Sequence, residues 1–82
     1  MREGARFAPK NIGDLMGEEL TDRERDVLSW AGRGKSVLDT ADILELSEDT
    51  VKTHVRNALK KLNANNKTHA VTKAIYLGLI IP

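Results

Sequence analysis

The sequence contains no cysteine, and this absence excludes disulfide bonds, thiolate catalysis and cysteine-based zinc sites. Aromatic residues are also rare, with one Phe, one Tyr and one Trp, which argues against a stacking platform for single-stranded nucleic acid. No apolar run approaches the roughly 18 residues of a membrane-spanning helix, and the N-terminus shows no signal-peptide pattern. The composition is that of an ordinary soluble globular protein, and the cytoplasm is its expected compartment.

Acidic residues are absent from the last part of the chain. All 12 Asp and Glu lie in residues 1–49, which carry 7 basic and 12 acidic side chains and therefore a charge of −5. Residues 50–82 contain no acid, and their cations are Lys52, Arg56, Lys60, Lys61, Lys67 and Lys73. The overall net charge of +1 hides this separation. A segment of one charge sign in a nearly neutral chain indicates a local site for a polyanion, and nucleic acid is the commonest polyanion.

The length of 82 residues corresponds to one small domain. Residues 1–19 mix glycine, proline and scattered charges, and their few apolar positions keep no steady period, so we expect a linker or flexible tail. A single helical turn from Ile12 to Met16 that docks on the core is the alternative for this segment. Residues 20–82 are expected to form the folded domain.

A capping signal opens the first helix of this domain. Thr21 and Glu24 have the spacing of a capping box, in which each side chain satisfies a backbone N–H of the other residue. The pattern predicts a helix from about Asp22 to Ala31. Gly32 and Gly34 follow it, and both can adopt the left-handed conformation that often ends a helix.

Residues 36–46 predict a second, short helix and a tight turn. Ser36 repeats the capping spacing and opens a helix through about Leu44. The preceding residues 32–36 are similar to the end of a phosphate-binding loop, but the first glycine of that motif would fall on Ser29 and no strand precedes it. The phosphate loop is therefore rejected, and the tight connection Glu45-Leu46 leads directly to the next helix in a helix-turn-helix layout.

Residues 47–62 predict a third, amphipathic helix that begins after the capping residue Ser47. Apolar residues at i, i+4, i+7, i+8 and i+11 from Val51 define a face that should be buried. The other face is polar and basic and carries Lys52, Thr53, Arg56, Asn57 and Lys60. This face is free to meet an anionic partner. A solvated surface helix without a ligand is the simpler alternative that such a pattern also allows.

A turn-favouring run, Asn63 to Asn66, separates this helix from a fourth one. The fourth helix is expected from about Lys67 to Leu77, with Gly78 as its stop and the apolar residues 79–81 behind it. Its apolar stripe consists of Ala70, Val71, Ala74 and Ile75, and Tyr76 and Leu77 lie partly off this stripe. This second apolar surface fits either a partner helix or docking of the tail on the domain's own core.

Five segments of the sequence carry a family pattern. They read Leu20-Thr21-x-x-Glu24-x-x-Val27-Leu28, Trp30-Ala31-x-x-Gly34-Lys35-Ser36, Ala41-x-x-Leu44-x-Leu46-Ser47-x-x-Thr50-Val51-Lys52-x-His54, Asn57-x-x-x-Lys61-Leu62, and Ala70. The region from Leu20 to Ile80 thus resembles the DNA-binding domain of LuxR-type transcription regulators, and segments 30–36 and 78–80 look more like the quorum-sensing branch. The resemblance implies an all-α, four-helix bundle that contains a helix-turn-helix. Thr40, in place of an aliphatic residue, and Glu45, in place of a frequent glycine, depart from the pattern; we expect Thr40 to weaken helix packing slightly.

The resemblance also implies roles for individual residues. The helix from Glu48 would lie in the major groove, with Lys52, Thr53 and Arg56 reading base edges, as the chemistry of these side chains allows. Phosphate contacts are expected from Lys35, Ser47, Thr50, Lys60, Asn66 and Lys67. The fourth helix would form a dimer through Val71, Ile75 and Tyr76, and His54 is expected to be half-buried packing, with a DNA contact as the alternative.

The expected function is sequence-specific binding of double-stranded DNA by a homodimer of a bacterial transcription regulator. RNA polymerase is a further candidate partner, and a sensor or receiver domain is expected to precede the domain in the full regulator. The alternative is a helical interaction module, such as an anti-activator that pairs with a related regulator through its last helix. An enzyme is not expected, because no carboxylate has triad or ligand spacing with His54 or His69. No metal site or cofactor is expected, and no membrane.

Overall fold

The computed structural model describes residues 19–81, and over these residues it contains four helices and no strand. In chain order they are α2 (Asp22–Gly32), α3 (Val37–Leu44), α4 (Glu48–Leu62) and α5 (Lys67–Tyr76). The all-α, four-helix prediction is confirmed, with bounds that differ from those expected by one residue in α2 and α5. The expected linker and the alternative turn at 12–16 lie outside the described residues, except for Glu19. In residues 19–81 no helix is long and apolar enough to cross a membrane.

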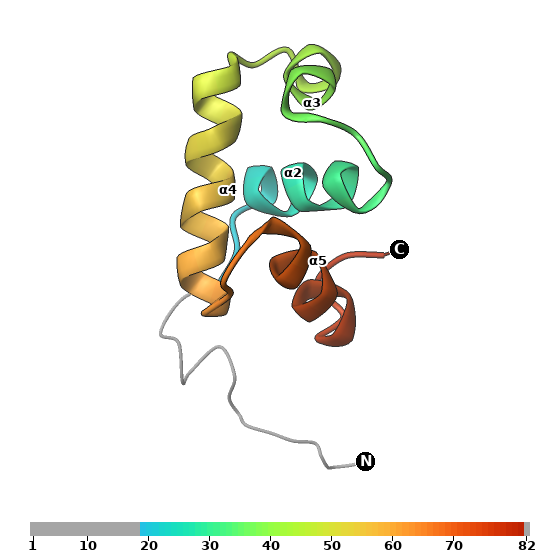
Figure 1. Cartoon of the computed structure of the whole chain (residues 1–82), viewed down its shortest axis with the longest axis vertical. Helices are drawn as coiled ribbons and strands as arrows, with labels where there is room; N and C mark the ends of the chain where they lie inside the picture. The colour runs from blue at the N-terminus through green and yellow to red at the C-terminus, as the bar shows by residue number, and fades with distance from the viewer. Residues whose placement is uncertain (1–18, 82) are drawn as a thin grey trace.

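The helices pack around α2 and α4. Figure 1 shows α4 along one side, α2 running across to it, and α3 and α5 on opposite sides of α2. Accordingly α2 and α4 each contact the other three helices. The apolar interior forms two clusters on either side. The larger joins α2, α4 and α5 through Leu20, Leu28, Ala58, Leu62, Ala70, Ala74 and Ile80. The smaller joins α2, α3 and α4 through Val27, Ala41 and Val51.

The predicted apolar face of α4 is buried as expected. Val51, Ala58 and Leu62 are each at most 2% exposed, and the longer side chains between them are half-buried. Full burial of a side chain such as Val51 or Leu62 contributes roughly 1.5 to 3 kcal/mol to the stability of the fold. Because Ala58 is wholly buried at the contact with α2 and α5, a larger residue there would force the helices apart. The periodicity of α4 therefore fixes how it sits against the rest of the domain.

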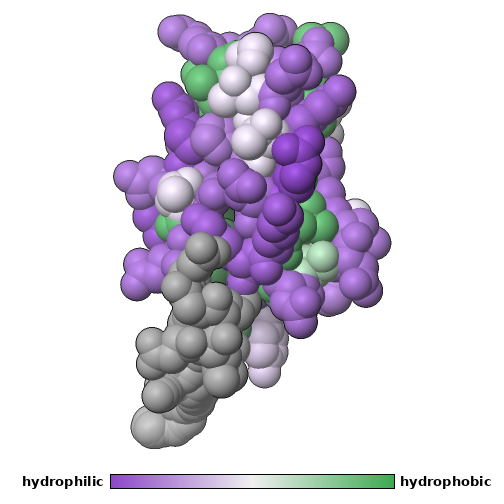
Figure 2. All heavy atoms as spheres, turned by 90° about the vertical axis from the view of Figure 1, so that its left-hand side faces the viewer, coloured by the Kyte–Doolittle hydropathy of each residue, from purple (hydrophilic) through white to green (hydrophobic). Residues whose placement is uncertain are grey.

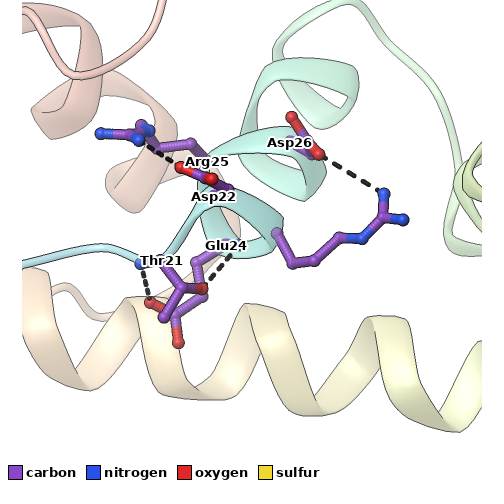
Figure 3. A network of polar contacts seen from close by, with 6 residues as sticks. Thr21, Asp22, Glu24, Arg25 and Asp26 are labelled. Carbon is purple, nitrogen blue, oxygen red and sulfur yellow. Dashed lines mark hydrogen bonds and ion pairs between the residues drawn. The ribbon is translucent and has the colours of Figure 1, made fainter.

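The helix starts follow the predicted capping. Thr21 Oγ1 accepts from the Glu24 N–H at 3.1 Å, and Glu24 Oε1 accepts from the Thr21 N–H at 2.9 Å, which completes the capping box (Figure 3). Ser36 and Ser47 cap α3 and α4 through hydrogen bonds from Asp39 N–H and Thr50 N–H. Asn66 does the same for α5, accepting from the His69 N–H at 2.8 Å. Side chains thus satisfy a free N–H at each helix start.

The capping glutamate also joins α2 to α4. Its side chain is 4% exposed and accepts a hydrogen bond from Lys61 Nζ at 2.9 Å, and the same Nζ donates to the Glu19 carbonyl at 3.1 Å. Burial opposes ionisation of Glu24, but the hydrogen bonds from Thr21 and the hydrogen bond and charge of Lys61 outweigh it, so the pKa of this carboxyl lies below its usual value. Glu24 is therefore a buried anion that Lys61 of α4 holds in place.

The helix ends are more varied than predicted. Gly34 and Gly78 have φ of 86° and 75°, as expected of glycines after a helix. Gly32 does not, because it is still helical, and a Cβ on it would lie 3.2 Å from Val71 Cγ1. The expectation of a left-handed Gly32 was therefore wrong, and the close approach of α5 is what favours glycine here. Glu45 ends α3 with φ of 58°, in the conformation that glycine adopts most easily.

The other departure from the family pattern, Thr40, is accommodated by a local hydrogen bond. Its side chain is buried, at 2% exposed, and its hydroxyl donates to the Ser36 carbonyl at 2.8 Å. The same carbonyl accepts from the Thr40 N–H at 2.9 Å. The hydroxyl is therefore buried with a partner, which avoids the cost of an unsatisfied donor. Part of the apolar tail docks on the core, since Ile80 is 7% exposed in the larger cluster and Leu79 packs against it, whereas Ile81 is 76% exposed.

Replacing Glu45 by glycine should stabilise the domain. The left-handed conformation costs a non-glycine residue roughly 1 to 2 kcal/mol, and the flexibility of glycine in the unfolded chain offsets up to about half of that. We expect the free energy of unfolding in urea to rise by roughly 0.5 to 1 kcal/mol. Glu45→Ala, which removes the same charge but keeps the Cβ, is the control and should give no gain. An equal gain in both variants would show that charge rather than backbone strain is responsible.

Glu24 should make stability dependent on pH. Because its folded pKa is below the usual 4.5, its ionised form contributes stability that is fully present above about pH 4.5 and lost as the pH falls through the lowered pKa. We expect Glu24→Gln to lower the free energy of unfolding by about 2 kcal/mol at pH 7, and the difference from the parent to shrink below that range. The control is Asp22→Asn, whose carboxylate is 91% exposed. A difference that is constant from pH 7 to pH 3 would contradict this.

Candidate nucleic-acid interface

The exposed face of α4 carries the three residues predicted to read bases. Lys52, Thr53 and Arg56 are all exposed, and they lie within about one turn of each other on the helix. Figure 2 looks onto the side of the molecule that α4 forms and shows a surface that is mostly hydrophilic, with small hydrophobic patches. The amphipathic pattern has therefore placed these side chains where a partner can reach them.

The six cations of the acid-free segment divide into two groups. Lys61 and Lys73 are engaged inside the domain, Lys61 with Glu24 and the Glu19 carbonyl, and Lys73 with the carbonyls of Leu62 and Asn63, both at 3.0 Å. The other four line one groove along α4 and the start of α5, and they are Lys52, Arg56, Lys60 and Lys67. The structure thus concentrates all the remaining positive charge of this segment on a single surface.

The groove itself has an apolar floor. Its volume is about 730 Å³, and besides the cations it is lined by Val37, Val55, Leu59, Asn63 and Ala64. Val37 comes from the first turn of α3, so the groove runs from the helix-turn-helix to the α4–α5 turn. No ion pair involves its four cations in the part of the chain that the structure describes. A surface of this kind attracts an anionic partner electrostatically and offers it apolar contact at the same time.

Thr53 is exposed with its hydroxyl proton already engaged. Its Oγ1 donates to the Asp49 carbonyl one turn earlier at 3.0 Å. The oxygen can still accept a hydrogen bond, and the methyl group can make apolar contact. Among the three candidate base readers, Lys52 and Arg56 therefore supply donors, whereas Thr53 supplies an acceptor and a methyl.

Ser47 and Thr50 lie together at the start of α4, outside the groove. Ser47 Oγ accepts from the Thr50 N–H at 3.0 Å and donates to Thr50 Oγ1 at 2.8 Å. This leaves the hydroxyl proton of Thr50 without an acceptor in residues 19–81, so Thr50 can donate to an external oxygen. Ser47 acts as the cap that orients it. Both residues were predicted to contact phosphate. In the structure Ser47 caps the helix and holds the Thr50 side chain, and the Thr50 hydroxyl is the group left for an external partner.

The α4–α5 turn supplies the other predicted phosphate residues. Asn66 uses its side-chain oxygen as the cap of α5, which leaves its amide N–H groups available, and Lys67 projects into the groove. His69 Nδ1 accepts from the Asn65 N–H at 3.1 Å and holds this turn in shape. Sequence reasoning missed this role of His69 and missed the cap that Lys73 provides for α4. The only signal for either was its place in the helix after the turn, His69 in the first turn of α5 and Lys73 in the last.

The remaining predicted residues are spread over other surfaces. Lys35 is exposed in the loop after α2, where its N–H donates to the Trp30 carbonyl at 3.1 Å, and it does not line the groove. His54 is half-buried, as expected. Of the predicted dimer residues, Val71 and Ile75 are half-buried against the larger cluster, whereas Tyr76 is 87% exposed.

Comparison with known proteins gives one consistent result. Residues 18–74 match the family described as bacterial regulatory proteins, luxR family. The structure is similar to that of the transcription factor GerE, with a TM-score of 0.72 at 33% identity, over 74% of this chain and 91% of that one. The helix-turn-helix fold and the sequence pattern therefore point to the same group of proteins.

Three curated relatives show how far the similarity extends. The chain is 56% identical over 61 residues to the transcriptional activator SolR of Ralstonia nicotianae and 52% identical over 63 residues to the transcriptional activator VanR of Vibrio anguillarum. These alignments cover 74% and 77% of this chain but only 26% of each relative. The transcriptional repressor ThaA of Burkholderia thailandensis is 38% identical over 93% of this chain and 35% of its own length. The chain therefore spans about a quarter to a third of these regulators.

Proposed function

We propose, from the fact that this chain belongs to the luxR family of bacterial regulatory proteins, that it binds specific sequences of double-stranded DNA with α4 in the major groove. The observation that carries the proposal is the groove along α4 and the start of α5, whose four cations have no ion-pair partner within residues 19–81. An α-helix fits the major groove of DNA. Each phosphate that a cation neutralises releases bound counterions, and this release strengthens binding. The work of such a regulator is done on the chromosome, in the cytoplasm.

Base reading is assigned to the exposed residues in the middle of α4. Arg56 can donate two hydrogen bonds to the acceptors of one guanine, and Lys52 can reach the same acceptors. The Thr53 oxygen can accept from an amino group of a base, and its methyl can pack on the methyl of thymine. Each good pair contributes roughly 1 to 3 kcal/mol of discrimination.

Phosphate contacts are assigned to residues around this centre. Thr50, with its free hydroxyl proton, lies at one end of α4, and Lys60, Asn66 and Lys67 lie at the other. Ser47 supports the contact of Thr50, and Lys35 is exposed for a further one. Because these groups flank the base readers, they can fix the register of α4 on the duplex without reading sequence themselves.

Dimerisation through α5 completes the proposal. Exposed Tyr76 is the centre of the contact, with half-buried Val71 and Ile75 beside it. A two-fold dimer would present two copies of α4 to half-sites about 10 base pairs apart. The names of the relatives, which include activators, a repressor and a quorum sensing-dependent regulator, support a role in transcription control. We further propose a sensor or receiver domain before this one, since the alignment covers only 26% of SolR, and RNA polymerase as a further partner.

The two groups of cations should differ in the salt dependence of DNA binding. Lys60→Met and Lys67→Met remove one proposed phosphate contact each, so the slope of log K against log salt should fall by about 0.9 in magnitude. Lys61→Met and Lys73→Met are the matched controls: they remove the same charge from the same segment but from internal bonds, and they should leave the slope unchanged while lowering thermal stability. Anisotropy titration of a labelled duplex below the melting temperatures measures all four. Equal slope changes in both pairs would contradict the assignment.

Arg56→Ala should reduce specificity more than affinity. The duplex is first selected from a randomised pool, in which we expect an inverted repeat with half-site centres about 10 base pairs apart. On that duplex the variant should lose roughly tenfold to a hundredfold in affinity, and on scrambled DNA far less. Lys60→Ala is the control and should weaken both duplexes alike. An equal loss of Arg56→Ala on both duplexes would refute base reading, and a pool without any enriched sequence would refute specific binding by this chain.

A further inference from the structure

The outward side of α3 is an unusual surface for so small a domain. Leu38 and Ile43 are 56% and 42% exposed, and Asp39 and Asp42 are exposed beside them. Glu45, also exposed, follows at the end of the helix. In residues 19–81 no ion pair engages any of these three acids. We call Leu38, Asp39, Asp42, Ile43 and Glu45 the α3 face; it combines apolar side chains with unpaired negative charge.

The α4 groove has the complementary chemistry. Its floor is apolar, and its rim carries Lys52, Arg56, Lys60 and Lys67. Three acids and two apolar side chains on the α3 face thus correspond to four cations and an apolar floor in the groove. Complementary charge steers association and fixes its register, and contact between the apolar parts stabilises the complex.

The two surfaces of one molecule do not meet. The inward side of α3 packs against α4, where Ala41 shares a cluster with Val51, and buried Thr40 lies on that side too. The helical residues of the α3 face, Leu38, Asp39, Asp42 and Ile43, lie on the opposite side of the helix from Thr40 and Ala41 and therefore point away from α4. Any contact between the α3 face and the groove must come from another molecule.

We propose that the α3 face of one copy of this chain docks in the α4 groove of a second copy. The contact uses two different surfaces, so it is heterologous, and it leaves a free α3 face and a free groove at the two ends of each assembly. It is separate from the proposed dimer through α5. Because the groove is the proposed DNA-binding surface, the regulatory consequence rests on the proposed function: a copy whose groove holds the α3 face of another copy is unable to bind duplex DNA, and duplex DNA displaces that face.

Two complementary variants test this directly. The groove variant is Arg56→Gln with Lys60→Gln, and the face variant is Leu38→Gln with Asp42→Asn. All four positions are exposed, so both proteins should fold. Both also carry Tyr76→Ser, at an exposed position, to remove association through α5. The parent for comparison carries Tyr76→Ser alone.

Sedimentation at about 0.05 M salt, where exposed charges are weakly screened, gives the result. We expect the parent to form larger species as its concentration rises and each variant alone to remain near 9.1 kDa. An equimolar mixture should form a complex of twice that mass and no larger, because only one productive contact is left. Raising the salt to about 0.5 M should weaken this complex at least tenfold. A mixture that stays monomeric, or variants that associate alone as well as the parent does, would overturn the proposal.

Adding duplex DNA separates this proposal from the proposed function. The face variant keeps the whole groove, so it should bind the selected duplex as the parent does and leave the mixed complex as DNA is added. If the mixture assembles but no protein binds duplex, and the chain that keeps Tyr76 does not bind it either, self-docking stands and the DNA-binding function fails. If the face variant binds duplex but the mixture remains monomeric, the groove serves DNA alone and self-docking fails.

Discussion

The domain depends on the burial of one face of α4. This helix contacts each of the other three. Its residue Val51 is buried in the smaller apolar cluster, and Ala58 and Leu62 are buried in the larger one. Only α2 also packs closely against all the other helices, so the core of this small domain depends on these two. Burial of one face also fixes the direction of the other, so the same periodicity that holds the core together presents Lys52, Thr53 and Arg56 to solvent. One face of α4 thus stabilises the core, and the opposite face carries the residues proposed to contact DNA.

Two lysines of the acid-free segment connect helices to one another. Lys61 joins α4 to the buried capping box of α2, and Lys73 joins α5 to the last carbonyls of α4. A buried ion pair contributes little net stability when compared with apolar packing, but leaving one partner alone is costly. Both side chains therefore act chiefly to set the position of α4 relative to its neighbours. The charges that remain form one surface and not a diffuse positive field.

The acidic residues of α2 are paired with cations, whereas those of α3 are not paired within residues 19–81. Glu24 is internal and neutralised by Lys61, and Asp22 and Asp26 pair with arginines on the surface of α2 (Figure 3). Those of α3 have no such partners in the part of the chain that the structure describes. Three exposed acids without an ion-pair partner in residues 19–81, Asp39, Asp42 and Glu45, therefore lie on the side of α3 turned away from the groove. This separation is what makes contact between two copies electrostatically favourable.

The sequence by itself determined the helices and their caps, because capping and apolar periodicity are local: Thr21 with Glu24, Ser47, and the stripe from Val51 to Leu62 all behave as predicted. It also predicted a polyanion site in the acid-free segment. Only the tertiary structure decided which cations belong to that site, since the partners of Lys61 lie 37 and 42 residues away. The same holds for Gly32, whose role depends on the approach of Val71, and for the apolar floor of the groove. A charge count along the chain cannot separate bound cations from free ones, because pairing depends on which helices meet.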